Sequence, residues 1–253
     1  MTRPRQRLFA LLLTLLPAAA HAGEVYAAVA ANFAVAAGQI GAEFQRQTGH
    51  VVHLSPGSSG KLYAQIVNGA PYEVFLAADA ERAQSLERDQ LAVSGSRFTY
   101  ARGRLVLWST RLKKVDADVL RAARFNHLAV ANPKIAPYGA ASLEVLNQLD
   151  VSPAVRARLV YGEDIGQTFQ LAASGAADLA FVALSQLRSA AGETAGVYWL
   201  VPSSLYPPIE QQAVLLRRGE HNAAARAFLD YLRMPAARAI LARFGYLATN
   251  DGS

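Results

Sequence analysis

The sequence contains no cysteine. This absence excludes structural disulfides, thiolate metal ligands and cysteine nucleophiles. Charged residues are also scarce, at 17% of the 253 positions, and the lysines and arginines are scattered rather than clustered. Because a nucleic-acid-binding protein typically carries a concentrated basic patch, nucleic acid is not an expected partner.

Metal-binding and catalytic patterns are missing as well. Glu163 and Asp164 form an acidic pair, but adjacent side chains point apart, and the helix dipole favours acids in a first turn. Asp79 has no carboxylate or histidine beside it and is expected to cap a helix. Four histidines are isolated from one another and lack the spacing of metal ligands: His50, His53, His127 and His221. We therefore expect no enzymatic activity, no resident cofactor and no direct metal-ligand side chain.

The N-terminus has the pattern of a cleavable secretory signal peptide, residues 1–22. A basic segment with three arginines precedes the apolar run Leu8–Leu16, which is too short to span a membrane. The small residues around Ala20 and Ala22 predict cleavage after Ala22, and no cysteine follows to carry a lipid anchor. Removal of the segment lowers the formal net charge from +6 to about +3. We expect a periplasmic protein.

The stretch Ser55–Leu62 joins an apolar strand, Val51–Leu54, to a helix predicted over Leu62–Asn68. A strand that ends in Pro-Gly and continues as a helix leaves the first helical N–H groups without intrahelical partners. Ser58 and Ser59 lie at this opening, where the helix dipole favours negative charge. Such a turn can hold an anion, although a serine here can also act only as the helix N-cap.

The preceding segment has the same organisation. The continuous apolar run Glu24–Ala31 is typical of a strand buried on both faces of a parallel sheet. Asn32 follows at a predicted N-cap, and the helix after it is expected to stop at Gly49. Because parallel strands end at the same edge of a sheet, Asn32 and Ser59 are expected at the edge where open α/β sheets bind ligands.

A second series of strands and helices is predicted beyond a third strand, Glu73–Ala78, and an irregular passage, Ser94–Arg102. Turns at Pro137–Gly139 and Asp164–Gly166 again place backbone N–H groups at helix starts. The strands of this series are predicted at Arg104–Trp108, His127–Ala131, Ala177–Ala183 and Val197–Pro202. A strand and two helices end the chain: Gln211–Leu216, Asn222–Leu232 and Ala236–Phe244. The pattern indicates an α/β protein.

Segments along nearly the whole mature chain resemble the periplasmic molybdate-binding proteins of ABC transporters. Each segment alone is short, but their order and spacing are specific. They are Val29–Phe33, Gly57–Leu62, Gly69–Pro71, Val74–Asp79, Asn132–Gly139, Gly162–Ile165, Phe228–Leu232 and Arg243–Tyr246.

The resemblance implies a two-lobed, type II periplasmic binding protein fold with an oxyanion in the cleft between mostly parallel sheets. The implied first lobe covers residues 23–103, the second 104–217, and C-terminal helices in 218–253 return to the first. In this family neutral donors hold the ligand: hydroxyls, an amide and backbone N–H groups. The corresponding positions here are Ala31, Asn32, Ser59, Tyr138 and Ile165. Ala183 replaces a tyrosine found in some members, so one hydroxyl is absent.

The implied function is capture of molybdate, and also tungstate, for delivery to the inner-membrane permease of an ABC importer by a monomeric protein. A binding protein for sulfate, phosphate or a small organic acid is the main alternative. An organic carboxylate usually needs an arginine, and Arg102 and Arg104 are the nearest candidates. A signalling or adhesion role without a small ligand is a further alternative.

An enzyme is the remaining alternative, and two motifs bear on it. Gly57–Gly60 does not meet the G-x-S-x-G spacing of a nucleophile elbow. Gly60-Lys61 lacks the rest of a phosphate loop, because Leu62 stands where a serine or threonine would bind magnesium and Ser55 where the first glycine would be.

Overall fold

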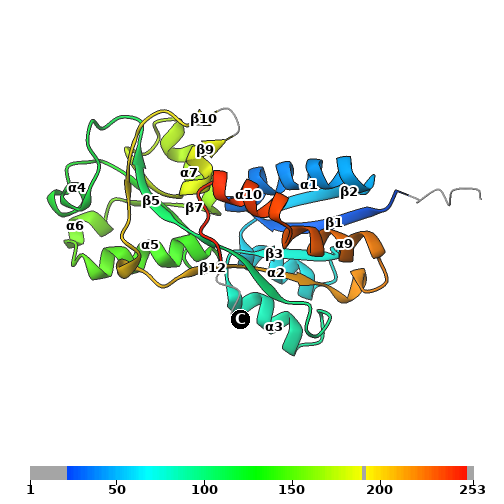
Figure 1. Ribbon diagram of the computed structural model, residues 1–253. Helices are drawn as coiled ribbons and strands as arrows, with labels where there is room; N and C mark the ends of the chain where they lie inside the picture. The colour runs from blue at the N-terminus through cyan, green and yellow to red at the C-terminus, as the bar shows by residue number, and fades with distance from the viewer. Residues whose placement is uncertain (1–21, 190–191, 250–253) are drawn as a thin grey trace, which may run out of the picture.

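The computed structural model describes residues 22–189 and 192–249, so the predicted signal segment lies outside the described residues except for Ala22. Two five-stranded sheets form two lobes that lie side by side (Figure 1). The first sheet has the order β2(Val51–Gly57), β1(Glu24–Ala30), β3(Val74–Ala77), β12(Ile209–Leu215), β4(Phe98–Gly103). The second has the order β11(Val197–Leu200), β5(Leu105–Ser109), β8(Leu179–Ala183), β6(Leu128–Ala131), β7(Leu159–Gly162).

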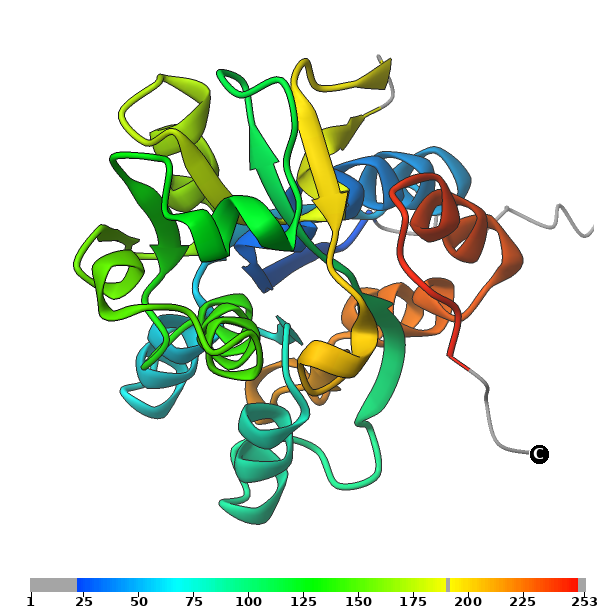
Figure 2. The same cartoon turned by 90° about the vertical axis from the view of Figure 1, so that its left-hand side faces the viewer.

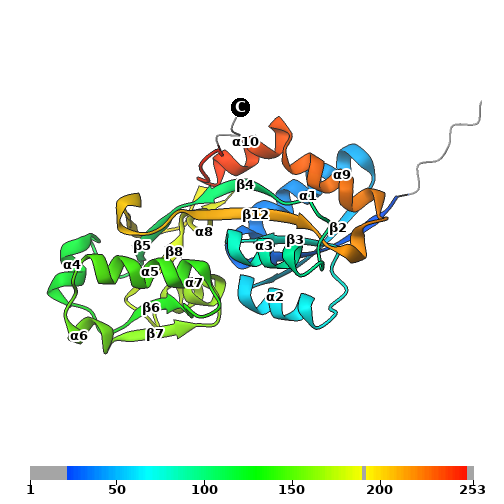
Figure 3. The ribbon, with the colours of Figure 1, turned by 90° about the horizontal axis from the view of Figure 1, so that it is seen from below.

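Helices cover both faces of each sheet, which gives each lobe three layers (Figure 3). The first lobe carries α1(Ala34–Thr48), α9(Ala223–Leu232) and α10(Pro235–Arg243) on one face, and α2(Ser59–Val67) and α3(Ala80–Arg88) on the other. The second lobe carries α4(Ala117–Ala122), α5(Pro137–Gln148), α6(Pro153–Arg156), α7(Ile165–Ala173) and α8(Leu184–Leu187). Across the described ranges, no helix is long and apolar enough to cross a membrane.

Short elements complete the chain. They are the 3-10 helices η1(Ala31–Phe33), η2(Ser203–Leu205) and η3(Arg217–Gly219), and a small antiparallel ribbon of β9(Arg188–Ser189) and β10(Gly192–Glu193). Figure 2 looks along the molecule from the second lobe toward the first. The predicted α/β fold with two lobes is confirmed.

The carboxyl ends of the central strands meet at the cleft. β1 runs parallel to β2 and β3, with Ala30 opposite Gly57 and Val29 opposite Leu76. All four β3 side chains and most of those in β1 are buried, as expected for strands covered on both faces. This register brings the turns after β1 and β2 to one edge of the first sheet, as the sequence predicts.

The chain crosses between the lobes twice, once between β4 and β5 and once between β11 and β12. β12 pairs antiparallel with both β3 and β4, so it belongs to the first sheet. The prediction that residues 104–217 form the second lobe is therefore wrong for this strand. The sequence predicted this strand but did not show which strands pair with it. The pairing depends on the path of the chain, which returns to the first lobe between β11 and β12.

Other differences from the predicted elements have local causes. The passage predicted as irregular contains most of β4, which pairs antiparallel with β12 and is bridged by Leu247 at Arg102. β2 continues through Pro56, which is tolerated because β2 lies at the edge of the sheet. Two helices begin three residues earlier than predicted, α2 at Ser59 and α5 at Pro137. Both extensions move helix N-termini closer to the cleft.

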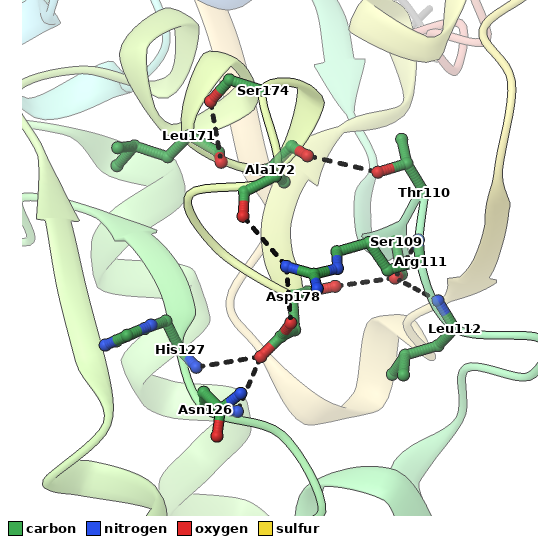
Figure 4. Close-up of polar contacts among 11 residues, drawn as sticks. Ser109, Thr110, Arg111, Leu112, Asn126, His127, Leu171, Ala172, Ser174 and Asp178 are labelled. Carbon is green, nitrogen blue, oxygen red and sulfur yellow. Dashed lines mark hydrogen bonds and ion pairs between the residues drawn. The ribbon is translucent and has the colours of Figure 1, made fainter.

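A polar cluster around Asp178 lies where β8 begins and β5 ends, and Figure 4 shows its contacts. The Asp178 carboxylate accepts hydrogen bonds from the backbone N–H groups of Asn126 at 2.7 Å and His127 at 3.3 Å. It also lies 3.4 Å from the Arg111 guanidinium. The Ser109 hydroxyl donates to the Asp178 carbonyl at 2.6 Å. These contacts tie the starts of β6 and β8 to the end of β5.

We predict that Asp178→Ala lowers the free energy of unfolding by about 1–3 kcal/mol, because two backbone donors lose their acceptor. Asp118→Ala is the matched control, since the exposed Asp118 carboxylate forms a surface ion pair with Arg121 at 3.0 Å. Urea unfolding of both variants measures the difference. Equal stabilities for the two variants would contradict this account of the cluster.

Candidate anion site

Four turns converge on one small cavity between the lobes. Two come from the first lobe, at the starts of η1 and α2, and two from the second, at the starts of α5 and α7. The cavity volume, taken as the space open to the centre of a water-sized sphere, is about 10 Å³, far below the ~300–1,000 Å³ of sites for organic ligands. Its lining residues are Ala30, Ala31, Asn32, Gly57, Ser58, Ser59, Ala78, Ala136, Pro137, Tyr138, Asp164 and Ile165.

Backbone N–H groups are the main polar feature of this cavity. Among the described residues, no hydrogen-bond acceptor is found for the amide hydrogens of Ala31, Asn32, Ser59, Tyr138 and Ile165. All five belong to the first turn of a helix, where intrahelical acceptors are unavailable. Each helix N-terminus also carries a partial positive charge. The structure thus brings together all five residues that the sequence singles out.

Ser59 contributes a hydroxyl as well as its amide. Of the two serines at this opening, Ser58 is the N-cap of α2, and its Oγ accepts from the N–H of Lys61 at 3.4 Å. The Ser59 Oγ accepts a hydrogen bond from the N–H of Ala78 at 2.9 Å, and Ser59 is 1% exposed. A hydroxyl that accepts one bond still has its own proton to donate. This bond fixes the oxygen while leaving its proton for a ligand.

Asn32 differs from its predicted role. It lies inside η1 rather than at an N-cap, and its side chain caps no helix. Its amide nitrogen donates to the Gln211 Oε1 at 2.9 Å and to the Tyr246 hydroxyl at 2.9 Å. A side-chain amide has two hydrogens, and both are used here. Asn32 can therefore offer a ligand its backbone N–H but no side-chain hydrogen.

Tyr138 and Ile165 face the cavity from the second lobe. Pro137 starts α5 and has no N–H, so the Tyr138 amide is the first donor of that helix. The Tyr138 ring is buried, and within the described residues its hydroxyl has no hydrogen-bond partner. Burial raises the pKa of Tyr138 well above its usual value. Ile165 is the first residue of α7, whose N-cap is Asp164, as predicted for an acid at this position.

Among the residues that the structure describes, no lysine or arginine lines the cavity. Its one acidic group, Asp164, uses Oδ1 to accept the N–H of Gln167 at 2.9 Å. Lys61 points instead to Glu163, with Nζ 2.5 Å from Oε1, and both side chains are half exposed. The hydrogen bond to Glu163 raises the pKa of Lys61. The donor set is neutral, and this chemistry suits an anion held by hydrogen bonds rather than by ion pairs.

The lobes touch each other on either side of the cavity. The N–H of Gly60 donates to the Ile135 carbonyl at 2.9 Å. The Arg82 guanidinium lies 3.4 Å from the Lys134 carbonyl, and it also pairs with Asp79. Together with the Lys61–Glu163 pair, these contacts join the two lobes. The structure is therefore in a closed arrangement of the two lobes.

The sequence-based prediction missed Gln211, Tyr246 and Ser185, which surround Asn32. They lie 179, 214 and 153 residues from it in the chain, and no local pattern connects them to it. Ala183, which replaces a tyrosine of some family members, is buried at the end of β8 and is not among the lining residues. Its N–H donates to the Gln186 side chain at 2.9 Å.

Comparison with known proteins identifies the family of this chain. The family described as bacterial extracellular solute-binding proteins matches residues 25–247. The chain belongs to this family. Among solute-binding relatives, the molybdate-binding protein ModA of Azotobacter vinelandii is 49% identical over 234 residues, covering 92% of this chain and 93% of that protein. ModA of Rhodobacter capsulatus is 48% identical over 233 residues, covering 92% and 90%.

Solved structures of solute-binding proteins agree with this assignment. The periplasmic molybdate-binding protein of Azotobacter vinelandii superimposes with a TM-score of 0.86 at 43% identity, covering 89% of this chain and all of that chain. The sulfate-binding protein SubI of Mycobacterium tuberculosis has a TM-score of 0.75 at 14% identity, covering 90% and 88%. The second likeness is one of fold alone.

We predict that Ser59→Ala weakens anion binding by about 1–3 kcal/mol, or roughly fivefold to 150-fold, because the ligand loses a buried donor. Ser96→Ala is a matched control: the Ser96 hydroxyl is also hydrogen-bonded in the first lobe, to Val93 and Leu215, but lies outside the cavity. Calorimetric titration of both variants measures the effect. Unchanged affinity in Ser59→Ala would place the anion elsewhere.

Proposed function

We propose that this chain is the solute-binding component of an ABC importer, and that it captures molybdate in the periplasm and delivers it to the membrane permease. The observation that carries the proposal is the cavity of neutral donors from both lobes. Relatives named as molybdate-binding proteins, at 48–49% identity over 92% of the chain, support the choice of anion. The mature protein begins after the predicted cleavage site at Ala22 and acts as a monomer without catalysis.

A tetrahedral dianion is costly to remove from water, so it needs a donor for most of its oxygen lone pairs. Hydrogen bonds to a charged group contribute about 1.5–3 kcal/mol each. Five backbone amides and the Ser59 hydroxyl supply six such donors, and without a counter-cation the anion can be released again to a transporter. Donors at fixed positions also select by size. Tungstate is nearly the same size as molybdate and is expected to bind too.

Binding and closure are coupled in this mechanism. Ala31, Asn32 and Ser59 belong to the first lobe, whereas Tyr138 and Ile165 belong to the second. The full donor set forms only when the lobes meet. A ligand that contacts both lobes stabilises the closed form by its difference in affinity for the two forms. The closed form is then the state that the permease recognises.

An organic acid is the less well supported alternative. Arg102 and Arg104, the predicted candidates for binding a carboxylate, lie at the crossover between the lobes and do not line the cavity. Arg102 also pairs with Glu210 at 3.4 Å. Sulfate and phosphate have the same tetrahedral shape as molybdate, and the site can distinguish them from it only by size. Their binding must therefore be tested directly.

Thermal unfolding of the mature, phosphate-free protein with molybdate, tungstate, sulfate or phosphate at equal concentration tests the proposal. A ligand at a thousand times its dissociation constant stabilises the folded protein by about 4 kcal/mol, which raises the Tm by roughly 10 °C. We expect this shift with molybdate and tungstate and little shift with sulfate. A larger shift with sulfate or phosphate would show that this anion, and not molybdate, is the ligand. The absence of a shift with all four anions would refute the oxyanion function.

Closure can be tested separately at Gly60. A Cβ at this position would lie 2.9 Å from the Cα and carbonyl oxygen of Ile135, across the cleft. We predict that Gly60→Ala keeps the lobes apart and weakens molybdate binding about tenfold. Gly38→Ala is the control, because nothing lies within 4 Å of a Cβ there. Small-angle scattering should show ligand-dependent compaction in the control and less in Gly60→Ala; equal compaction and affinity would contradict the closure mechanism.

A further inference from the structure

Asn32 forms several hydrogen bonds within the protein that a role in ligand binding does not require. Its side-chain amide nitrogen donates two hydrogen bonds. In addition, its backbone carbonyl oxygen accepts hydrogen bonds from the Ser185 hydroxyl at 2.8 Å and the Tyr246 hydroxyl at 2.9 Å. A carbonyl has two lone pairs, so this oxygen is saturated. Asn32 is 4% exposed, which leaves little water to replace these partners. Four hydrogen bonds thus fix one residue of η1.

The partners come from three distant parts of the chain. Gln211 lies in β12, Tyr246 follows α10, and Ser185 lies in α8 of the second lobe. Tyr246 is central among them, because its hydroxyl both accepts from the Asn32 side chain and donates to the Asn32 carbonyl. Its oxygen also lies 3.2 Å from the Ser185 Oγ. The position of η1 is therefore set by tertiary contacts from both lobes.

We propose that Tyr246 and Gln211 are positioning residues of the anion site, which hold Asn32 so that the N–H groups of Ala31 and Asn32 point at the ligand with the spacing that molybdate requires. This inference rests on the proposed function. An anion held only by fixed dipoles depends on donor placement, since preorganised donors lose little freedom on binding. If the turn at Ala31 and Asn32 becomes mobile, its N–H donors remain but their spacing is no longer fixed. The discrimination between anions by size is then the first property to be lost.

Tyr100 provides a control that distinguishes the positioning of Asn32 from ordinary aromatic packing. Tyr100 is buried against the same Phe33 ring, at 4.8 Å between centroids, whereas the Tyr246 ring lies at 5.7 Å. The Tyr100 hydroxyl has no hydrogen-bond partner within the described residues, and Tyr100 lies in β4, outside the cavity. Tyr246→Phe and Tyr100→Phe remove the same atom from the same aromatic cluster. Only the first removes contacts to Asn32.

The experiment is calorimetric titration of the two mature variants and the wild type with molybdate and with sulfate. For Tyr246→Phe we expect the molybdate dissociation constant to rise about tenfold while sulfate binding changes little, so that the selectivity ratio falls about tenfold. Tyr100→Phe is expected to match the wild type with both anions. An unchanged molybdate constant in Tyr246→Phe overturns the proposal, and so does an equal loss for both anions.

Hydrogen exchange of the ligand-free proteins tests the positioning without any anion. Tyr246→Phe should speed amide exchange in residues 30–36 relative to the wild type, and Tyr100→Phe should not. Equal protection of this segment in all three proteins overturns the proposal. If the wild type binds neither anion, the proposed function fails, and exchange alone then decides whether Tyr246 positions the turn.

Discussion

An anion in this cavity is held by dipoles rather than by ion pairs, because none of the described residues that line it carries a positive charge. The fold meets this constraint by bringing four helix N-termini to one point, two from each sheet. Parallel strands make this possible, since they deliver successive helices to the same sheet edge. The small cavity, the neutral donors and the need for closure all follow from the same arrangement.

The structure gives Asn32 a different importance from that of an ordinary ligand residue. Its side chain connects the first strand to β12 and to the C-terminal segment, and its carbonyl contacts the second lobe through Ser185. The C-terminal helices that return to the first lobe thus do more than complete its core. Through Tyr246 they reach the edge of the anion site, so remote parts of the chain set the geometry of a short turn.

The sequence was sufficient for what depends on neighbouring residues. The apolar run before Asn32 predicted a buried strand, and the Pro-Gly-Ser-Ser turn predicted a second strand that ends at a helix start. Both strands are present, β1 mostly buried and β2 partly exposed at the sheet edge. It was insufficient where long-range pairing decides. β12 joined the first sheet because the chain returns in the opposite direction, and the partners of Asn32 lie more than 150 residues away. Which of Ser58 and Ser59 caps α2 depends on the residue at which the helix begins, and sequence patterns do not fix a helix boundary that closely.

The most direct test of an anion site built from neutral donors is a crystal structure of the mature protein grown with molybdate, with anomalous data collected at the molybdenum edge. The account predicts one strong anomalous peak in the cavity, with oxygens about 3 Å from the amide nitrogens of Ser59, Tyr138 and Ile165 and no lysine or arginine in contact. A peak beside a cationic side chain, or at the crossover near Arg102 and Arg104, would contradict it.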